Sequence, residues 1–232
     1  MAMTTYPVSF VDPDDVARVA ANLAEVRRRI RDAGADPLTV GIVAMTKSFG
    51  GALVRVAAQL GLGAVGENYV GELESKRREV GNLAVRWHYL GALQSNKIAR
   101  VLAVADVVGA VSRESEIRKI AALRPRTTID VQVDLTELAQ RQGARPAEVA
   151  RLVEIARDHG LDVRGLMTVA SPAIDAATAQ FARIDELAGE LGLRGRSMGM
   201  SDDLEVAVAH GSTEIRIGRA LFGPRTRPTP LT

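Results

Sequence analysis

The segment VAMTKSF, residues 43–49, places a lysine just beyond an apolar run. Residues 40–45 carry no polar side chain, as expected of a buried strand, and Lys47 follows one residue later. An ammonium group is costly to desolvate, so one explanation is that Lys47 reaches out into solvent. The other is that partial burial favours the neutral amine, a nucleophile that can attack a carbonyl. This segment alone favours the first explanation.

Two glycine-containing segments near the end of the chain could bind an anion. In SMGMSDD, Gly199 permits close backbone approach, and the Ser201 hydroxyl could either bind a ligand or cap the following helix. In RIGRALFG, the backbone N–H groups of Gly218 and Arg219 could face a phosphate. Arg216 alternates with two isoleucines and is therefore either ion-paired in the core or directed at a ligand, and the sequence leaves both open.

Strand-like and helix-like segments alternate along the chain and must position these residues. Strands are predicted near residues 39–46, 64–68, 85–91, 106–112, 127–135, 163–171, 194–200 and 213–218, and helices near 12–34, 52–60, 69–81, 95–105, 114–124, 147–160, 176–192, 203–211 and 219–223. Eight such units with short connections predict a parallel sheet and, most economically, one (β/α)8 TIM barrel. A doubly wound open sheet is the alternative, although KSFGG lacks its glycine fingerprint.

The predicted barrel spans residues 1–232 as a single domain, with the proline-rich residues 224–232 as a frayed tail. The 232 residues are 47% hydrophobic and 25% charged, with a net charge of +2. Basic residues are mixed with acids, as in ESKRREV, which favours a solvated helix face and no basic surface for nucleic acid. The chain has no cysteine, and its three histidines show no metal-binding spacing. Without a membrane span or a secretory signal in the pattern, we expect a cytoplasmic protein.

In a TIM barrel, the C-terminal ends of the strands build the active site. This rule collects the following candidates from the strand ends: Lys47, residues 67–68, residues 88–91, Asp134, residues 167–168, residues 197–201 and residues 216–218. Among them, His88 is interpreted as a structural histidine. An amine after the first strand and an anion site after the last two would share one barrel mouth. Pyridoxal 5′-phosphate (PLP) or a sugar phosphate with a carbonyl group would satisfy both.

Several motifs occur in a characteristic order between about residues 40 and 223. These are AMTKSF, VGENYVGEL, WHYLGALQSNK, GLMTVAS and SMGMSDDLEVAVAHGSTEIRIGRALFG. Together they resemble the pyridoxal-phosphate homeostasis proteins, and the last block is the most specific. The resemblance implies a (β/α)8 barrel like the N-terminal barrel of alanine racemase and of fold-type III decarboxylases. It also implies that PLP is bound as an internal aldimine on Lys47.

The resemblance further implies roles for the other site residues. Arg216 should approach the pyridine nitrogen, where its permanent charge disfavours a ring proton and leaves a weaker electron sink. Ser201, Gly218 and the amide of Arg219 should hold the phosphate. The predicted cofactor-binding residues are Lys47, Asn68, Met167, Met200, Ser201, Arg216, Gly218 and Arg219, of which Asn68, Met167 and Met200 line the surroundings of the ring. No catalytic residue and no metal ligand is predicted.

Two positions depart from the pattern of this family. Asp134, in QVDL, stands where the family often has asparagine. Arg141, in TELAQRQGA, stands where a lysine is common. Arginine cannot form an imine at neutral pH, so a role of this loop in secondary PLP binding or transfer is in doubt.

The sequence therefore predicts a PLP carrier for intracellular PLP homeostasis and not an enzyme. The first alternative, a racemase-like enzyme acting on amino acids, needs an acid or base on the second face of the cofactor. In such enzymes an added domain or partner chain supplies it, and only nine residues follow Gly223. A Schiff-base aldolase on sugar phosphates is less favoured and would need Glu67 or Asp134 beside the lysine. We expect a monomer that binds PLP and, transiently, PLP-dependent apoenzymes, without nucleic acid or membrane partners.

Overall fold

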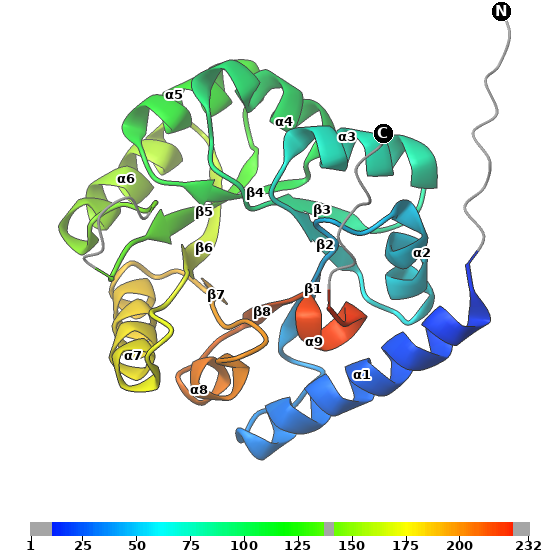
Figure 1. Ribbon diagram of the computed structural model, residues 1–232. Helices are drawn as coiled ribbons and strands as arrows, with labels where there is room; N and C mark the ends of the chain where they lie inside the picture. The colour runs from blue at the N-terminus through cyan, green and yellow to red at the C-terminus, as the bar shows by residue number, and fades with distance from the viewer. Residues whose placement is uncertain (1–10, 137–141, 225–232) are drawn as a thin grey trace, which may run out of the picture.

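Eight short strands, all parallel, close into a barrel in the computed structural model, which describes residues 11–136 and 142–224 (Figure 1). The strands are β1 (Gly41–Met45), β2 (Ala64–Glu67), β3 (Arg86–Tyr89), β4 (Val107–Val111), β5 (Thr128–Val133), β6 (Asp162–Thr168), β7 (Gly195–Ser197) and β8 (Glu214–Ile217). Each strand pairs with the next, and β8 pairs with β1. The predicted TIM barrel is confirmed, and the open-sheet alternative is wrong.

Helices surround the barrel and cover the outer face of the sheet (Figure 1). They are α1 (Pro13–Asp32), α2 (Gly51–Gln59), α3 (Val70–Val80), α4 (Ile98–Val104), α5 (Glu114–Leu123), α6 (Pro146–Asp158), α7 (Ile174–Glu190), α8 (Leu204–Ala209) and α9 (Arg219–Phe222), with the short 3-10 helix η1 (Ser95–Lys97) before α4. Apolar residues at helical spacing pack against the strands, because only one face of each helix meets the sheet.

Helix α1 shows how the sequence pattern fixes an element. Its buried residues are Val19, Leu23, Val26 and Ile30, which are spaced three or four residues apart and form one apolar stripe. Asp12 caps the N-terminus, where its carboxylate accepts a hydrogen bond from the N–H of Asp14 at 2.9 Å. The stripe places α1 against the barrel beside α8 and α9, next to the segments predicted to bind an anion (Figure 1).

All eight strands end one to three residues earlier than predicted, and the ends of β7 and β1 matter for the site. Strand β7 stops at Ser197, because Gly199 adopts a left-handed φ of +97° that a strand cannot continue through. A Cβ at Gly199 would also lie 2.7 Å from the Cβ of Ala207. Strand β1 stops at Met45, so Lys47 lies in the turn that follows and not in the strand itself.

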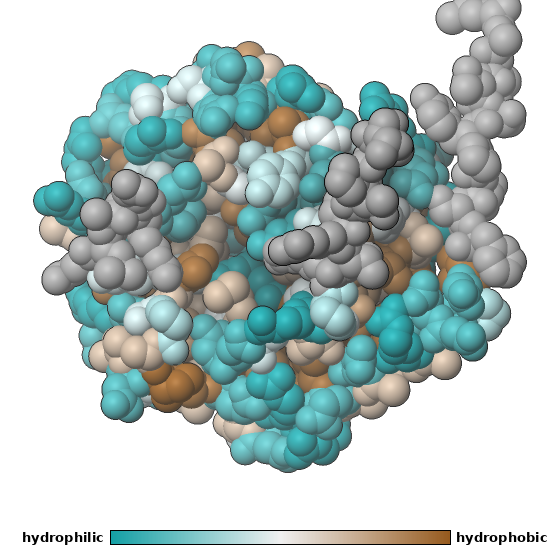
Figure 2. Space-filling model, in the orientation of Figure 1, coloured by the Kyte–Doolittle hydropathy of each residue, from teal (hydrophilic) through white to brown (hydrophobic). Residues whose placement is uncertain are grey.

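The surface is polar over most of the face drawn in Figure 2, and its apolar residues form small separate groups. In the part of the chain that the structure describes, the large apolar side chains that are at least half exposed are Leu38, Tyr69, Leu123 and Ile174. None of the described helices is both long enough and apolar enough to span a membrane. The predicted frayed tail lies outside the described residues, apart from Pro224.

Candidate cofactor-binding site

A cavity of about 480 Å³ opens at the C-terminal ends of the strands. All eight predicted cofactor-binding residues line it: Lys47, Asn68, Met167, Met200, Ser201, Arg216, Gly218 and Arg219. Six further residues complete the lining: Met45, Phe49, Leu90, Val169, Asp202 and Pro224. Leu90 falls in the candidate range 88–91 and Asp202 in SMGMSDD, whereas the other four are apolar residues without a chemical signal in the sequence. The cavity has the size and mixed polarity of a small-molecule site.

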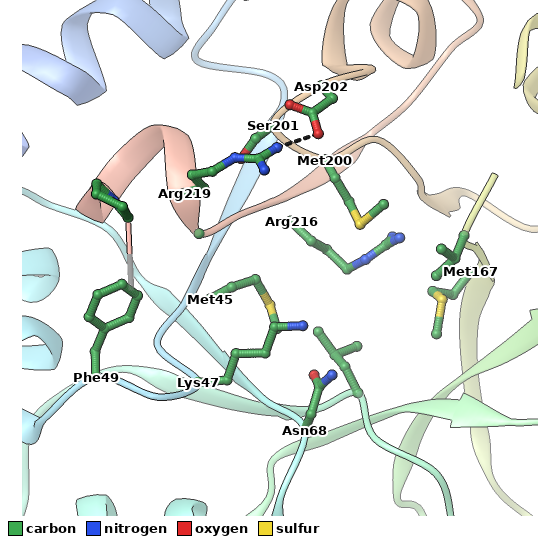
Figure 3. Close-up of a pocket in the computed structure, with 14 residues that line it drawn as sticks. Met45, Lys47, Phe49, Asn68, Met167, Met200, Ser201, Asp202, Arg216 and Arg219 are labelled. Atoms are coloured by element: carbon green, nitrogen blue, oxygen red, sulfur yellow. Dashed lines mark hydrogen bonds and ion pairs between the residues drawn. The ribbon is translucent and has the colours of Figure 1, made fainter. Parts of the chain in front are cut away.

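Lys47 enters the cavity from a tight turn after β1. The carbonyl of Thr46 accepts a hydrogen bond from the N–H of Phe49 at 2.9 Å, which closes the turn around Lys47 and Ser48. Ser48 has a left-handed φ of +67°, a value that the third residue of a type II turn requires and that glycine usually supplies. Lys47 is half-buried, and Figure 3 shows its amine extending toward the middle of the cavity.

Arg216 is buried at the wall of the cavity and is held by neutral groups. Its Nη1 donates to the carbonyl oxygen of Ser197 and, at 3.2 Å, to the hydroxyl of the same residue. Its Nη2 donates to the carbonyl oxygen of Thr168 at 2.6 Å. No carboxylate forms an ion pair with it among residues 11–136 and 142–224. The core ion pair, one of the two explanations that the sequence left open, is therefore not observed.

Burial lowers the pKa of Arg216, and the attraction of Glu214, Asp203 and Asp130 opposes this effect. An arginine nevertheless stays protonated in proteins near neutral pH. The cavity wall therefore carries a fixed positive charge that no direct carboxylate contact within the described chain neutralises. Such a charge suits an electron-rich atom or an anion of a ligand.

An anion cradle lies where the segments after β7 and β8 meet. The hydroxyl oxygen of Ser201 accepts a hydrogen bond from the N–H of Ala220 at 3.1 Å, which leaves the hydroxyl proton available. The backbone N–H groups of Gly218 and Arg219 donate to no protein group within the described residues. Helix α8 begins at Leu204 with Asp203 as its N-cap, so the idea that Ser201 caps this helix is wrong.

The two acidic residues beside the cradle are both engaged away from it. Asp202 pairs with the guanidinium of Arg219 at the rim, where both side chains are exposed (Figure 3). Asp203 is buried and accepts a hydrogen bond from the N–H of Met200. Only the backbone of Arg219 is therefore left to face the cradle. The repulsion that two neighbouring carboxylates would exert on an anion is reduced by these contacts.

Asn68 owes its position to a close approach of two loops. A Cβ on Gly91 would lie only 1.9 Å from the carbonyl oxygen of Asn68, so only glycine allows the loop after β3 to pack against the loop after β2. Met167, from β6, and Met200, from the loop after β7, line the wall nearer Arg216 (Figure 3). Their role in holding a cofactor stays a prediction.

Other candidates from the strand ends lie outside this cavity. His88 is 1% exposed, and burial lowers its pKa to about 4 despite the attraction of Glu214, so it is a neutral structural histidine at neutral pH. Asp134 accepts hydrogen bonds from the N–H and hydroxyl of Thr136, which is a local turn. Glu67 is fully buried beneath the Lys47 turn. The Arg141 position lies outside the described residues.

Comparison with known proteins identifies the family. Residues 15–226 match the family described as alanine racemase, N-terminal domain. The pyridoxal phosphate homeostasis protein of Pseudomonas aeruginosa is 38% identical over 230 residues, which cover 94% of this chain and 100% of that protein. The protein of the same name from Escherichia coli K12 is 32% identical, over 89% of this chain and 97% of that protein. The chain belongs to the pyridoxal phosphate homeostasis proteins, within the alanine racemase N-terminal domain family.

Solved structures agree with the resemblance to the pyridoxal phosphate homeostasis proteins drawn from the motifs. PipY from Synechococcus elongatus, solved with PLP bound, has a TM-score of 0.78 and 30% identity, over 88% of this chain and 100% of that chain. Alanine racemase from Corynebacterium glutamicum has a TM-score of 0.68 at 17% identity, over 89% of this chain but only 60% of the racemase. At that identity, the second likeness supports the barrel fold alone.

Proposed function

We propose that this protein binds PLP reversibly through Lys47 and holds it for buffering or delivery in PLP homeostasis. When bound, PLP supplies an aldehyde that a neutral primary amine attacks, so that a C=N bond replaces C=O and one water leaves. Among the described lining residues, Lys47 brings a primary amine to the cavity. The homeostasis proteins named above and the PLP-bound PipY structure support this proposal.

One observation carries the proposal. An amine on the turn after β1 and an anion cradle after β7 and β8 line the same cavity of about 480 Å³. The two free N–H groups at Gly218 and Arg219, with the Ser201 hydroxyl, match the acceptor oxygens of a phosphate. The aldehyde and phosphate of PLP fit this pair of features, because both groups belong to one small aromatic molecule.

Arg216 would determine the electronics of the bound ring. Its guanidinium is fixed by carbonyl oxygens on β6 and β7 and cannot move away from the cavity wall without breaking those bonds. A permanent cation near the pyridine nitrogen disfavours a proton there. The bound ring would then be a weak electron sink, which suits storage of the cofactor better than turnover of amino acids.

The alternative enzymes find less support at this site. An aldolase was expected to use Glu67 or Asp134, and neither residue lines the cavity. A racemase-like reaction needs a second acid or base, and the carboxylate among the described lining residues, Asp202, is paired with Arg219. We therefore propose one PLP-binding domain that works without turnover, as a cytoplasmic monomer with PLP-dependent apoenzymes as transient recipients.

The absorption spectrum of the protein mixed with PLP tests the proposal. We expect a visible band that borohydride removes, with the reduced adduct on the peptide that contains Lys47. Lys47→Ala should fold normally and lose the reducible adduct, because the other site residues cannot form an imine.

Lys97→Ala is the matched control, because Lys97 lines a neighbouring cavity and not the one that contains Lys47, so it should not affect the band. A reduced adduct mapped to any other lysine would contradict the assignment of Lys47. The absence of any adduct in the wild-type protein would contradict the proposed function.

A further inference from the structure

A buried ion cluster lies under the turn that carries Lys47. Lys76, on α3, is only 5% exposed. The interpretation of its segment, ESKRREV, as a solvated helix face is therefore wrong for Lys76. Its Nζ donates to the carbonyl oxygen of Thr46 at 2.6 Å, to Glu67 Oε1 at 2.6 Å and to Glu72 Oε2 at 3.0 Å. All three protons of the ammonium group are thereby used.

The cluster holds the peptide groups on both sides of Lys47. On the preceding side, the carbonyl of Thr46 accepts from Lys76. On the following side, the N–H of Ser48 donates to Glu72 Oε2 at 2.8 Å. This second bond fixes Ser48 in its left-handed conformation, which costs a non-glycine residue about 1–2 kcal/mol. The cluster therefore opposes relaxation of the one strained residue next to the amine.

Burying the charged groups of this cluster costs free energy. Glu67 is fully buried, and burial raises its pKa although Lys76 and the Thr46 hydroxyl both stabilise the carboxylate. Its Oε2 has no hydrogen-bond partner in the described part of the chain. Apolar residues of the same volume are often as stabilising as a buried ion pair. Unlike apolar residues, these charged groups form directed hydrogen bonds to the backbone on either side of Lys47.

We propose that Lys76, with Glu67 and Glu72, is a positioning cluster that fixes the turn and so aims the Lys47 amine into the cavity. The inference rests on the proposed function. None of the three residues lines the cavity, so the cluster acts through the turn and does not touch the ligand. A small displacement of a reacting atom can slow its reaction by about a hundredfold. Loosening the turn should therefore slow bond formation at Lys47 and leave phosphate binding intact.

Glu72→Ala is the first test, because Glu72 is partly exposed and its loss leaves the buried Lys76–Glu67 pair in place. We expect formation of the reducible PLP adduct on Lys47 to slow by about tenfold. Binding of pyridoxine 5′-phosphate, which has the phosphate but no aldehyde, should stay within about twofold of wild type, because this ligand does not react with Lys47 and depends on the anion cradle. Glu72→Gln keeps an acceptor for the Ser48 N–H and should restore most of the rate.

Glu74→Ala is the matched control. Glu74 lies on the same helix and pairs with Arg100 at 2.6 Å, away from the turn, so both measurements should match wild type. Lys76→Met is the stronger test of the cluster and should slow adduct formation more than Glu72→Ala. If Lys76→Met does not fold, the comparison of Glu72→Ala with Glu72→Gln still tests whether the cluster positions the amine.

Three outcomes overturn the inference in distinguishable ways. If Glu72→Ala slows formation of the PLP adduct and weakens binding of pyridoxine 5′-phosphate by the same factor, the cluster supports the general fold and does not position the amine. If neither the rate of adduct formation nor the binding of pyridoxine 5′-phosphate changes, the turn does not depend on the cluster. If the wild-type protein itself forms no adduct, the proposed function fails and this inference fails with it.

Discussion

Two arginines enter the interior of the barrel, Arg164 from β6 and Arg216 from β8, and their charges are balanced differently. Arg164 donates to both oxygens of Asp130 on β5 and to both oxygens of Glu214 on β8. Because β5 and β8 are not neighbouring strands, this side chain crosses the interior. Arg216 donates instead to two carbonyl oxygens and one hydroxyl.

This difference separates a structural region from a binding region inside one barrel. The Asp130–Arg164–Glu214 group contains its own counter-charges and needs no ligand. Arg216 has only neutral partners, so its charge remains available at the cavity wall, where Lys47 also lies. A buried charge without a partner is costly, and an electron-rich or anionic ligand would lower that cost. The pairing of each arginine therefore indicates its role better than its burial does.

Arg164→Met should give the largest effect, a loss of about 3–5 kcal/mol in the free energy of unfolding, because it leaves the buried Asp130 and the mostly buried Glu214 without a cation. Arg216→Met is the comparison variant. It leaves only carbonyl and hydroxyl groups without their hydrogen-bond donor, so we expect a loss of about 2 kcal/mol in the free energy of unfolding. Urea unfolding of both proteins without ligand measures the two values.

Binding of PLP should show the opposite order for the same two variants. Arg216→Met should weaken PLP or shift its absorption, whereas folded Arg164→Met should bind it as wild type does. Equal losses of stability, together with equal effects on PLP, would break the comparison. Both arginines would then be structural.

The sequence could predict much of the fold because the barrel depends on a repeated local pattern. Eight apolar strand segments, each followed by an amphipathic helix, are visible in the chain without knowledge of distant contacts. The barrel rule then placed residues from the strand ends in one mouth, and the eight predicted site residues do line one cavity. The early end of β7 was missed because the left-handed φ of Gly199 depends on its packing against α8.

The partners of charged side chains could not be predicted in the same way. Arg164 in VRGLM and Arg216 in IRIG have the same pattern, one arginine between apolar strand residues. Their different partners come from strands that are distant in sequence. Lys76 was likewise interpreted as an exposed helix residue, because nothing in ESK shows that Glu67 and the Lys47 turn lie against it. Such contacts exist only once the barrel has closed.

His88 offers a test of the structural region at lower pH. Its pKa of about 4 lies below the ordinary value of 6.5, because burial disfavours the imidazolium and Glu214 compensates only in part. The unfolded chain therefore binds the proton first. The stability that neutral His88 provides is complete above about pH 6.5 and is lost as the pH falls toward 4.

Between about pH 7.5 and about pH 5, the wild type should lose about 2 kcal/mol more unfolding free energy than His88→Gln. Urea unfolding of both proteins across this range is the measurement. Parallel curves would mean that His88 accepts a proton in the fold and adds a second cation beside Glu214. The structural region would then have a different charge balance from the one described above.

Ser201 gives the smallest effect and tests the binding region. Lys47 can react with the aldehyde of PLP and of unphosphorylated pyridoxal alike, so covalent chemistry does not distinguish them. The Ser201 hydroxyl and the N–H groups of Gly218 and Arg219 can do so, through charge-assisted hydrogen bonds of about 1.5–3 kcal/mol each. The wild type should therefore prefer PLP by at least about a hundredfold.

Ser201→Ala should cost about tenfold in PLP affinity, or about 1.4 kcal/mol, and almost nothing for pyridoxal. Gly218→Val should cost more, because a Cβ there already lies 3.3 Å from Met45 and larger groups would obstruct the cradle. Ser95→Ala, an exposed serine away from the cavity, is the control for removal of a hydroxyl. Titration of each protein with both aldehydes measures these effects. If both ligands weaken equally in Ser201→Ala, the phosphate is bound elsewhere, and the segments after β7 and β8 are not the anion site of the binding region.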